Sequence, residues 1–306
     1  MTRPEPMPRR IQTEWRLRTR SLPAGKRTLV MGVVNLTPDS FSDGGLFLEP
    51  ERAVEHALRL LDEGADLLDL GAESTRPGSR AGDPESAAVS ADEEQARLLP
   101  VLEALLKARP EAVISVDTYK AATARAAVAA GAEIVNDVSG FTWDGAMAAA
   151  CAELGCGVVL MHTRGRPEEW RTQPALEPDL LISLMRDGLA KSLQTAHGVG
   201  ISADRVVLDP GYGLGKRFDQ NYALLARQAE LLALGRPLLA GLSRKSFLTR
   251  TLSQAPGYRE REDSRETASV AALVAAILHG ASIVRVHEVR AAVEAAAIAD
   301  AVLAAH

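Results

Sequence analysis

A polar or charged side chain follows each of eight short apolar runs that are spread along the whole chain. Carboxylates and amides at such positions can accept hydrogen bonds from a ligand, and arginine or lysine can hold an anion. A single polar residue at such a position is as often a helix cap as a ligand. Polar residues after all eight apolar runs are more than helix capping requires. The residues concerned are Asn35, Asp69, Asp117, Asn136 with Asp137, Met161 with His162, Asp209, Arg244 to Ser246, and Arg285 with His287.

Three of these residues are acceptors without a basic neighbour in the sequence: Asp117, Asn136 and Asp209. Two carboxylates and an amide around one pocket suit a heterocycle with adjacent N–H donors, because an ionised carboxylate can accept two such donors at once. The set therefore predicts binding of a ring with a 2-amino-4-oxopyrimidine edge.

Basic residues near the end of the chain predict an anion site. Arg285 and His287 are two residues apart in an expected strand, so they share one of its faces. With Asn35 and Arg76 they form the expected anion clamp. A phosphate or pyrophosphate group held by the loops after the first and last strands is typical of barrel enzymes.

Two further motifs resemble catalytic patterns without matching them. The run "DPGYGLGK" is not a phosphate loop, because Arg217 stands where serine or threonine is required; we interpret it as a tight turn beside a flat ligand. In "GLSRKS", Lys245 stands where a nucleophile elbow needs glycine. Ser246 is expected to open a helix whose N–H groups could bind a carboxylate.

These residues need a scaffold that brings eight strand ends together. From Leu29 onward the chain repeats an amphipathic helix, a glycine and a short apolar strand. The repeat predicts a closed (β/α)8 TIM barrel, in which all C-terminal strand ends face one mouth. An open doubly wound sheet is the alternative, but it would concentrate site residues at one switch point. The expected strands are residues 29–34, 66–70, 112–117, 133–136, 157–162, 205–209, 237–242 and 282–286.

We expect a single domain, since no linker divides the chain. Residues 11–28 alternate around Trp15 and then turn, which predicts a short N-terminal hairpin. Residues 1–10 are rich in Arg and Pro and lack the apolar segment of a secretory signal. They are expected to be a disordered lead-in to a barrel domain over residues 11–306.

Composition limits the possible partners. Hydrophobic residues make up 46% and charged residues 25% of the 306 residues, as in globular proteins. A net charge of -5 argues against binding to nucleic acid or a membrane surface, which needs a basic face. Cys151 and Cys156 are too few for a disulfide framework and wrongly spaced for zinc, so we expect reduced thiols in a cytoplasmic protein.

Together, the motifs resemble those of the dihydropteroate synthase family from about Leu29 to the C-terminus. The resemblance implies a pterin-binding barrel that joins 6-hydroxymethyl-7,8-dihydropterin diphosphate to 4-aminobenzoate and releases pyrophosphate, with Mg2+ as cofactor. The sequence departs from the common family pattern at Ala72, Leu214 and Glu288. The matching segments are "MGVVNLTPDSFSDGG", "LDLGAESTRPGS", "ISVDT", "IVNDVSG", "VLMH", "LDPGYGLGK", "LLAGLSRKS" and "VRVHEV".

The resemblance also implies roles for individual residues. The implied pterin-binding residues are Asp117, Asn136, Met161, Asp209 and Lys245. The implied diphosphate-binding residues are Asn35, Thr75, Arg76, Arg285 and His287, with Asn35 as the metal ligand. The implied aminobenzoate-binding residues are Phe41, Thr75, Arg76, Pro77 and Ser246. The implied catalytic residues are Asp117, Lys245, Arg285 and His287.

Other functions stay open at this point. A pterin-binding methyltransferase handles no diphosphate, so Lys245 and the Arg285–His287 pair count against it. A Schiff-base aldolase would use Lys245 as its nucleophile. A pterin-binding paralogue without turnover would bind the pterin diphosphate yet release no pyrophosphate. We expect small molecules as the substrates, and the alanine-rich late helices predict a homodimer.

Overall fold

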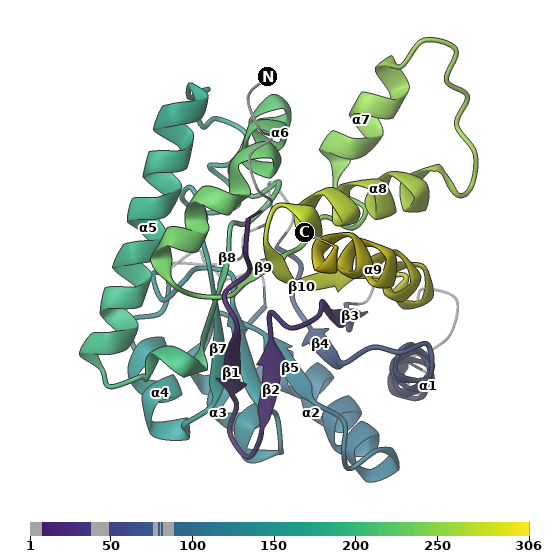
Figure 1. The fold of residues 1–306 in the computed structure, drawn as a ribbon. Helices are drawn as coiled ribbons and strands as arrows, with labels where there is room; N and C mark the ends of the chain where they lie inside the picture. Colours follow the sequence, from purple (N-terminus) through teal and green to yellow (C-terminus); the bar gives the residue numbers. More distant parts are fainter. Residues whose placement is uncertain (1–7, 38–48, 76–78, 80, 82–88, 306) are drawn as a thin grey trace.

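Eight parallel strands close into a barrel in the computed structural model, which describes residues 8–37, 49–75, 79, 81 and 89–305 (Figure 1). The strand order around the ring is β10-β3-β4-β5-β6-β7-β8-β9, so the last strand pairs with the first. This closure confirms the (β/α)8 barrel and excludes the open sheet. The strands are β3 (Leu29–Asn35), β4 (Leu67–Gly71), β5 (Ile114–Asp117), β6 (Ile134–Asp137), β7 (Gly157–Met161), β8 (Val206–Asp209), β9 (Leu238–Ala240) and β10 (Ala281–Val286).

Helices between the strands cover the outside of the barrel, as Figure 1 shows. Two helices, α7 and α8, both lie between β9 and β10. None of the helices in the described ranges is long and apolar enough to cross a bilayer. The helices are α1 (Glu49–Asp62), α2 (Ala91–Ala108), α3 (Ala121–Ala129), α4 (Met147–Leu154), α5 (Pro178–Gly198), α6 (Phe218–Arg227), α7 (Ser246–Gln254), α8 (Ser264–Leu278) and α9 (Val289–Ala304), with the 3-10 helices η2 (Ala203–Arg205) and η3 (Gln228–Leu234).

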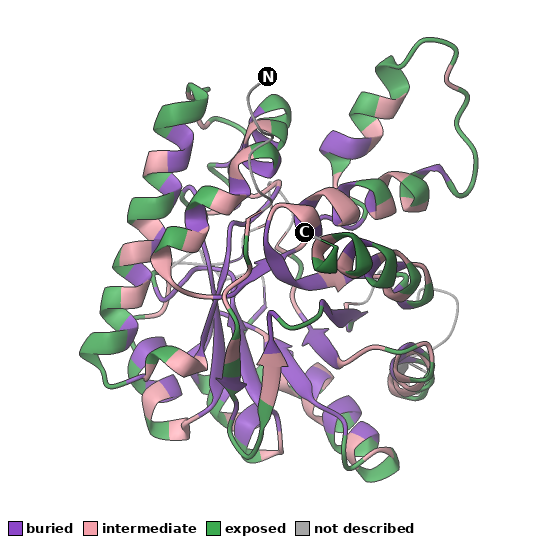
Figure 2. Ribbon diagram, in the orientation of Figure 1, coloured by how far each residue is buried: buried purple, intermediate pink, exposed green. Residues whose placement is uncertain are grey.

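Side chains alternate between the two faces of each barrel strand, and both faces are buried (Figure 2). In β4, Leu68 and Leu70 belong to the apolar cluster that packs under the helices. Leu67 belongs instead to the cluster inside the barrel. Asp69 is two residues further along β4, so it shares the inward face with Leu67.

A short hairpin of β1 (Thr13–Arg16) and β2 (Ser21–Ala24) closes the N-terminal end of the barrel. Trp15 and Leu17 are buried among the inward apolar residues of the strands, and the Trp15 indole N–H donates to the Arg205 carbonyl at 2.9 Å. Gly157 makes room for the hairpin, because a Cβ there would lie 2.8 Å from Leu17 Cδ2. The predicted hairpin is confirmed, and the opposite end of the barrel is left for a site.

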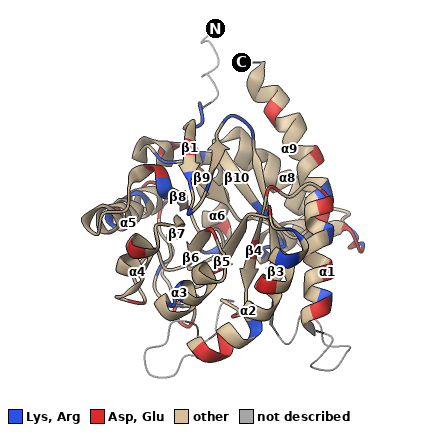
Figure 3. Ribbon diagram, turned by 90° about the horizontal axis from the view of Figure 1, so that it is seen from below, with Lys and Arg blue, Asp and Glu red and all other residues tan. Residues whose placement is uncertain are grey.

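Charge is distributed over the helices without a basic face in the view of Figure 3, where Lys and Arg are interspersed with Asp and Glu. Many of these residues form exposed ion pairs, such as Arg109 with Asp62 and Arg125 with Glu153. Such pairs contribute little to stability. The charges that matter for function lie inside the barrel.

Candidate active site

A polar layer lies above the apolar layer inside the barrel, at the C-terminal ends of the strands. Each member follows an inward apolar or small residue by two positions, as Asp69 follows Leu67 and Arg285 follows Ile283. Because the strands are parallel and closed, all these side chains converge on one mouth. The inward positions at this level hold Asn35, Asp69, Asp117, Asn136, Met161, Asp209 and Arg285.

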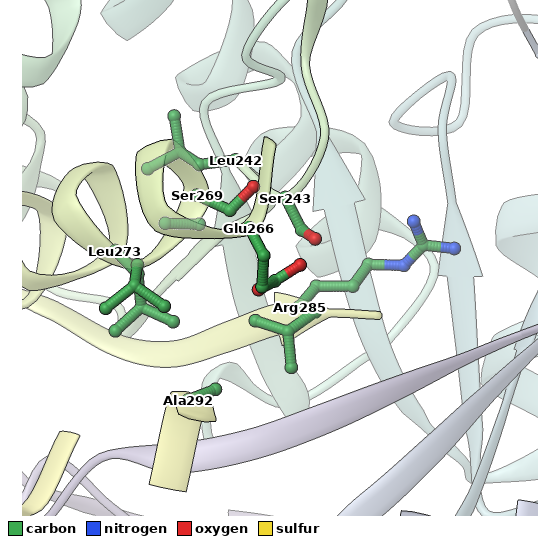
Figure 4. A pocket seen from close by; sticks show the side chains of 10 residues that line it. Leu242, Ser243, Glu266, Ser269, Leu273, Arg285 and Ala292 are labelled. Atoms are coloured by element: carbon green, nitrogen blue, oxygen red, sulfur yellow. The ribbon is translucent and has the colours of Figure 1, made fainter. Parts of the chain in front are cut away.

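Arg285 joins two carboxylates at the centre of this layer. Its Nε donates to Asp69 Oδ2 at 2.6 Å and its Nη2 donates to Asp117 Oδ2 at 2.8 Å. Figure 4 shows the Arg285 side chain extending away from Leu273 and Ala292. The sequence predicts Arg285 as an anion ligand, and the structure adds that its charge is shared by two acids.

Asn136 belongs to the same network, because its Nδ2 donates to Asp69 Oδ2 at 3.0 Å. This bond leaves the amide oxygen as the free acceptor of Asn136. Asp69 itself has no exposed surface. Its Oδ1 atom has no hydrogen-bond partner among the residues that the structure describes.

Asp117 is poised between its two protonation states. Burial raises its pKa to about 7; Arg285 acts in the opposite direction and the negative charge of Asp69 adds to the increase. A carboxyl with this pKa is partly ionised at neutral pH. The fraction of Asp117 that is ionised, and can accept two N–H donors from a ligand, therefore increases with pH around neutrality.

Asp209 and two lysines form the other side of the layer. Burial raises the pKa of Asp209, whose Oδ1 accepts from the Gly211 N–H at 2.7 Å. Burial lowers the pKa of Lys245 to about 8, although the charge of Asp209 partly offsets this effect. The Lys245 side chain lies over Gly213, where a Cβ would be 3.1 Å from Lys245 Cδ.

Lys216 is a buried cation that sequence reasoning missed. Its Nζ donates to the carbonyls of Gly211 at 2.7 Å and of His162 and Leu214 at 3.2 Å. Burial lowers its pKa to about 7. Its hydrogen bonds stabilise the turn that follows Asp209. The only sequence signal for this role is the position of Lys216 at the end of the glycine-rich run.

His287 follows the end of β10 and is held by Ser243. Its Nδ1 lies 2.9 Å from Ser243 Oγ, and its backbone N–H donates to the same oxygen at 3.3 Å. In the tautomer whose Nδ1 accepts from the Ser243 hydroxyl, Nε2 is the N–H donor of the ring. Burial lowers the pKa of His287 to about 3, and the charges of Arg244 and Arg285 add to the decrease, so the ring is neutral at pH 7.

A cavity of about 10 Å³ lies behind Ser243, between β9, β10, α8 and α9. Its polar lining includes Ser269 and Glu266, which Figure 4 shows beside Ser243. A space of this size holds about one water molecule. It is too small for a substrate, so we place the candidate site at the open mouth on the inward side.

Two polar residues at strand ends point outward and have structural roles. Asp137 accepts from the backbone N–H groups of Ser139 and Phe141, both at 2.8 Å, so it caps the turn after β6. His162 packs against α5, where a Cβ on Gly188 would lie 2.7 Å from His162 Cδ2. Burial lowers the pKa of His162 well below its usual value, which keeps the ring neutral.

Residues 31–287 match the sequence pattern of a family described as pterin binding enzymes. The chain is 44% identical over 272 residues to the dihydropteroate synthase of Mycobacterium leprae, with 89% of this chain and 92% of that protein covered. The chain belongs to the dihydropteroate synthase family.

Solved structures of the family have the same fold. The Xanthomonas albilineans dihydropteroate synthase with 4-aminobenzoic acid has a TM-score of 0.83 and 41% identity, covering 95% of this chain and 99% of that one. The same enzyme in complex with 7,8-dihydropteroate has a TM-score of 0.77 and 40% identity, covering 91% of this chain and 94% of that one.

The residues that the dihydropteroate synthase resemblance singles out fall into three groups. Asp117, Asn136, Met161, Asp209, Lys245 and Arg285 converge at the barrel mouth, with His287 just beyond β10. Asn35 is exposed at the end of β3, Thr75 is half-buried after β4, and Ser246 is exposed at the start of α7. Phe41, Arg76 and Pro77 lie outside the described residues.

Met161 belongs to an apolar cluster at the barrel mouth. It is buried with Tyr119 and Val138, and Trp143 and Leu214 pack against this group. The Tyr119 and Trp143 rings meet edge to face, with centroids 5.2 Å apart. Such a cluster is suited to the face of a flat ring, with the carboxylates at its edge.

Proposed function

We propose that this protein is a dihydropteroate synthase, which condenses 6-hydroxymethyl-7,8-dihydropterin diphosphate with 4-aminobenzoate and releases pyrophosphate. The observation that carries the proposal is the inward layer of acceptors Asp117, Asn136 and Asp209 beside the cations Arg285 and Lys245. Solved relatives with 4-aminobenzoic acid and with 7,8-dihydropteroate support one substrate and the product of this reaction.

The pterin ring binds at the bottom of the mouth. Its N–H donors meet the carboxylates of Asp117 and Asp209 and the Asn136 amide oxygen, and Lys245 supplies an N–H donor to a ring acceptor. Met161 contacts the face of the ring. Each charge-assisted hydrogen bond contributes about 1.5 to 3 kcal/mol to binding.

The reaction breaks a C–O bond to the diphosphate, which leaves as pyrophosphate, and forms a C–N bond to the arylamine, whose nitrogen then loses one proton to water or to the pyrophosphate. The amine is already neutral at pH 7, so it needs no strong general base. The leaving diphosphate needs positive or N–H donor groups, which we assign to Arg285 and the Nε2–H of His287. An ionised Asp117 stabilises positive charge that develops on the pterin methylene carbon.

The aminobenzoate carboxylate binds at the N-terminus of α7, where Ser246 begins the helix. Backbone N–H groups in the first turn of a helix have no partner within the helix, and the helix dipole favours an anion there. Thr75 lies after β4 on the same rim of the barrel. Phe41, Arg76 and Pro77 are proposed to complete this subsite.

Mg2+ fits the site as a partner of the diphosphate. Among the described residues there is no group of three His, Cys, Asp or Glu side chains that could hold a metal ion. Mg2+ commonly binds through substrate phosphates and one or two protein oxygens, and the exposed Asn35 amide offers such an oxygen. When bound, the ion would neutralise the charge of the leaving group.

We propose a cytoplasmic homodimer. Ile298 and Val302 on α9 are 69% and 41% exposed, and a pair of apolar residues four apart on a helix forms a stripe. An exposed apolar stripe is typical of an interface. Cys151 and Cys156 are buried free thiols, as expected in a reducing compartment.

The activity is tested by steady-state measurement of pyrophosphate. We expect release only when pterin diphosphate, 4-aminobenzoate and Mg2+ are all present. Binding of the pterin diphosphate without release would identify a paralogue without turnover. Absence of release together with methyl transfer from a methylated pterin would identify a methyltransferase.

Pterin affinity is expected to depend on pH through Asp117. The pKa of its carboxyl is about 7 in the free protein, and the bound ring requires the ionised form. The dissociation constant of 6-hydroxymethylpterin should therefore rise about tenfold for each pH unit below 7. Calorimetry between pH 5.5 and 7.5 measures it, and a constant affinity over this range would exclude Asp117 as the acceptor.

A further inference from the structure

Asp69 is the one carboxylate of the polar layer whose place in the site remains unexplained. It lies in the middle of β4, has no exposed surface, and binds Arg285 and Asn136 through the same oxygen. A side chain with no exposed surface cannot touch a substrate at the mouth. Any effect of Asp69 on the reaction must therefore pass through the residues beside it, which are Arg285, Asn136 and Asp117.

We propose that Asp69 is a positioning residue of the pterin site, which directs the Asn136 amide oxygen toward the ring and draws the Arg285 guanidinium partly away from Asp117. This inference rests on the proposed function, because it assigns Asn136 and Asp117 to the pterin. It adds a residue that acts only through its neighbours.

The first part of the argument concerns Asn136. A side-chain amide can turn over and exchange its N–H2 and oxygen positions unless a neighbour discriminates between them. Asp69 Oδ2, which also accepts from Arg285 Nε, lies 3.0 Å from Asn136 Nδ2, where it accepts an N–H and would repel the amide oxygen. The amide oxygen is therefore fixed as the acceptor for a ring N–H. Without Asp69, both orientations of the amide become accessible.

The second part concerns Arg285 and charge. Asp69 receives Nε and Asp117 receives Nη2, so one cation serves two acids. If Asp69 were absent, the whole charge of Arg285 would act on Asp117 and compete with the pterin for its oxygens. Asp69 also raises the pKa of Asp117 through its own negative charge. Its removal should lower that pKa.

Two variants separate the acceptor from the charge of Asp69. Asp69→Asn can place its oxygen where Oδ2 lies, so both hydrogen bonds persist while the negative charge is lost. Asp69→Ala removes both. The matched control is Ser115→Ala, because Ser115 pairs with Asp69 in the β4–β5 register and is equally buried. Its hydroxyl has no hydrogen-bond partner within the described ranges.

The readout is the dissociation constant of 6-hydroxymethylpterin by calorimetry as a function of pH, with thermal unfolding to verify the fold. Asp69→Ala should weaken binding roughly tenfold at pH 8, the loss of one ring hydrogen bond. Asp69→Asn should keep most of the affinity that Asp69→Ala loses. The pH below which its pterin binding weakens should be lower than in the unmodified protein by about one unit. The pH midpoint reports the charge that Asp69 exerts on Asp117, and the affinity at pH 8, which Asp69→Asn keeps and Asp69→Ala loses, reports the positioning of Asn136.

The proposal is overturned if Asp69→Ala binds the pterin as tightly as the unmodified protein, or if Asp69→Asn keeps the unmodified pH midpoint. Ser115→Ala should match the unmodified protein in both measurements, and a shifted limb in this variant would also count against Asp69. Failure of the proposed function gives a different result, because the unmodified protein would then release no pyrophosphate, whereas the role of Asp69 is read from pterin binding by the variants.

Discussion

Replacement of Asp117 by asparagine is expected to lower kcat/KM for the pterin diphosphate about a thousandfold at pH 8. Two effects combine in this value. Loss of a charge-assisted acceptor weakens ring binding about tenfold to a hundredfold. Loss of the negative charge beside the pterin methylene removes electrostatic stabilisation of the transition state, which adds about a hundredfold or more.

The measurement is steady-state pyrophosphate release, with pterin binding followed separately by calorimetry. Asn at position 117 keeps the shape of the side chain, so the fold should persist. Its binding should also lose the acid limb near pH 7, because that limb belongs to the Asp117 carboxyl. Activity within tenfold of the unmodified protein would remove Asp117 from the catalytic group.

The second large effect is expected for Arg285→Met, which should destabilise the fold by about 3 kcal/mol at pH 8. This change leaves the buried carboxylate of Asp69 and the half-buried carboxylate of Asp117 without their shared cation, and the loss of one partner of a buried pair is costly. Arg285 lowers the pKa of Asp117, so its removal moves that pKa above 7. Chemical denaturation measures the loss.

The sign of the pH dependence follows from this shift. A carboxyl whose pKa is raised in the folded state destabilises the fold when ionised, and it gains a proton as pH falls. The loss of free energy of unfolding caused by Arg285→Met should therefore be largest above pH 8 and smaller at pH 6. The control is Arg244→Met: Arg244 is 46% exposed and pairs with Glu288 at the rim, so its loss should cost less than about 1 kcal/mol.

The same Arg285→Met protein tests the diphosphate role. Its KM for the pterin diphosphate should rise by a larger factor than its dissociation constant for free 6-hydroxymethylpterin. Equal losses for the two ligands would mean that Arg285 serves the ring and the charge balance of the acids, and that the diphosphate is held by other groups.

The fold could be predicted from the sequence because each barrel strand is a short apolar run that follows an amphipathic helix. Each expected strand, such as residues 133–136 or 282–286, overlaps a strand of the structure, and the repeat itself implies closure. The hairpin followed from the alternation around Trp15. Its position across the N-terminal end did not, because that depends on packing of Trp15 and Leu17 against strands far away in sequence.

The residues of the site were predictable where their position depends only on the alternation of inward and outward side chains along a strand. Asp117, Asn136 and Asp209 each stand two residues after an inward residue, and Asp137 and His162 do not. The same alternation includes Asp69, whose place at a strand end was predicted and whose role was not. The ion pairs of Arg285 could not be predicted, because Asp69 and Asp117 are 216 and 168 residues away in the sequence. The burial of Lys216 could not be predicted either, because it depends on the folded turn.

The placement of β10 between β9 and β3 has a consequence for biosynthesis. A ribosome delivers the chain from its N-terminus, so β4 and β5 emerge long before β10. The final strand carries Arg285, so the guanidinium that binds Asp69 and Asp117 joins them only when this strand docks. Sealing of the ring and neutralisation of its interior are thus the same event, and a nascent chain that stops short of Arg285 should be unable to retain a pterin.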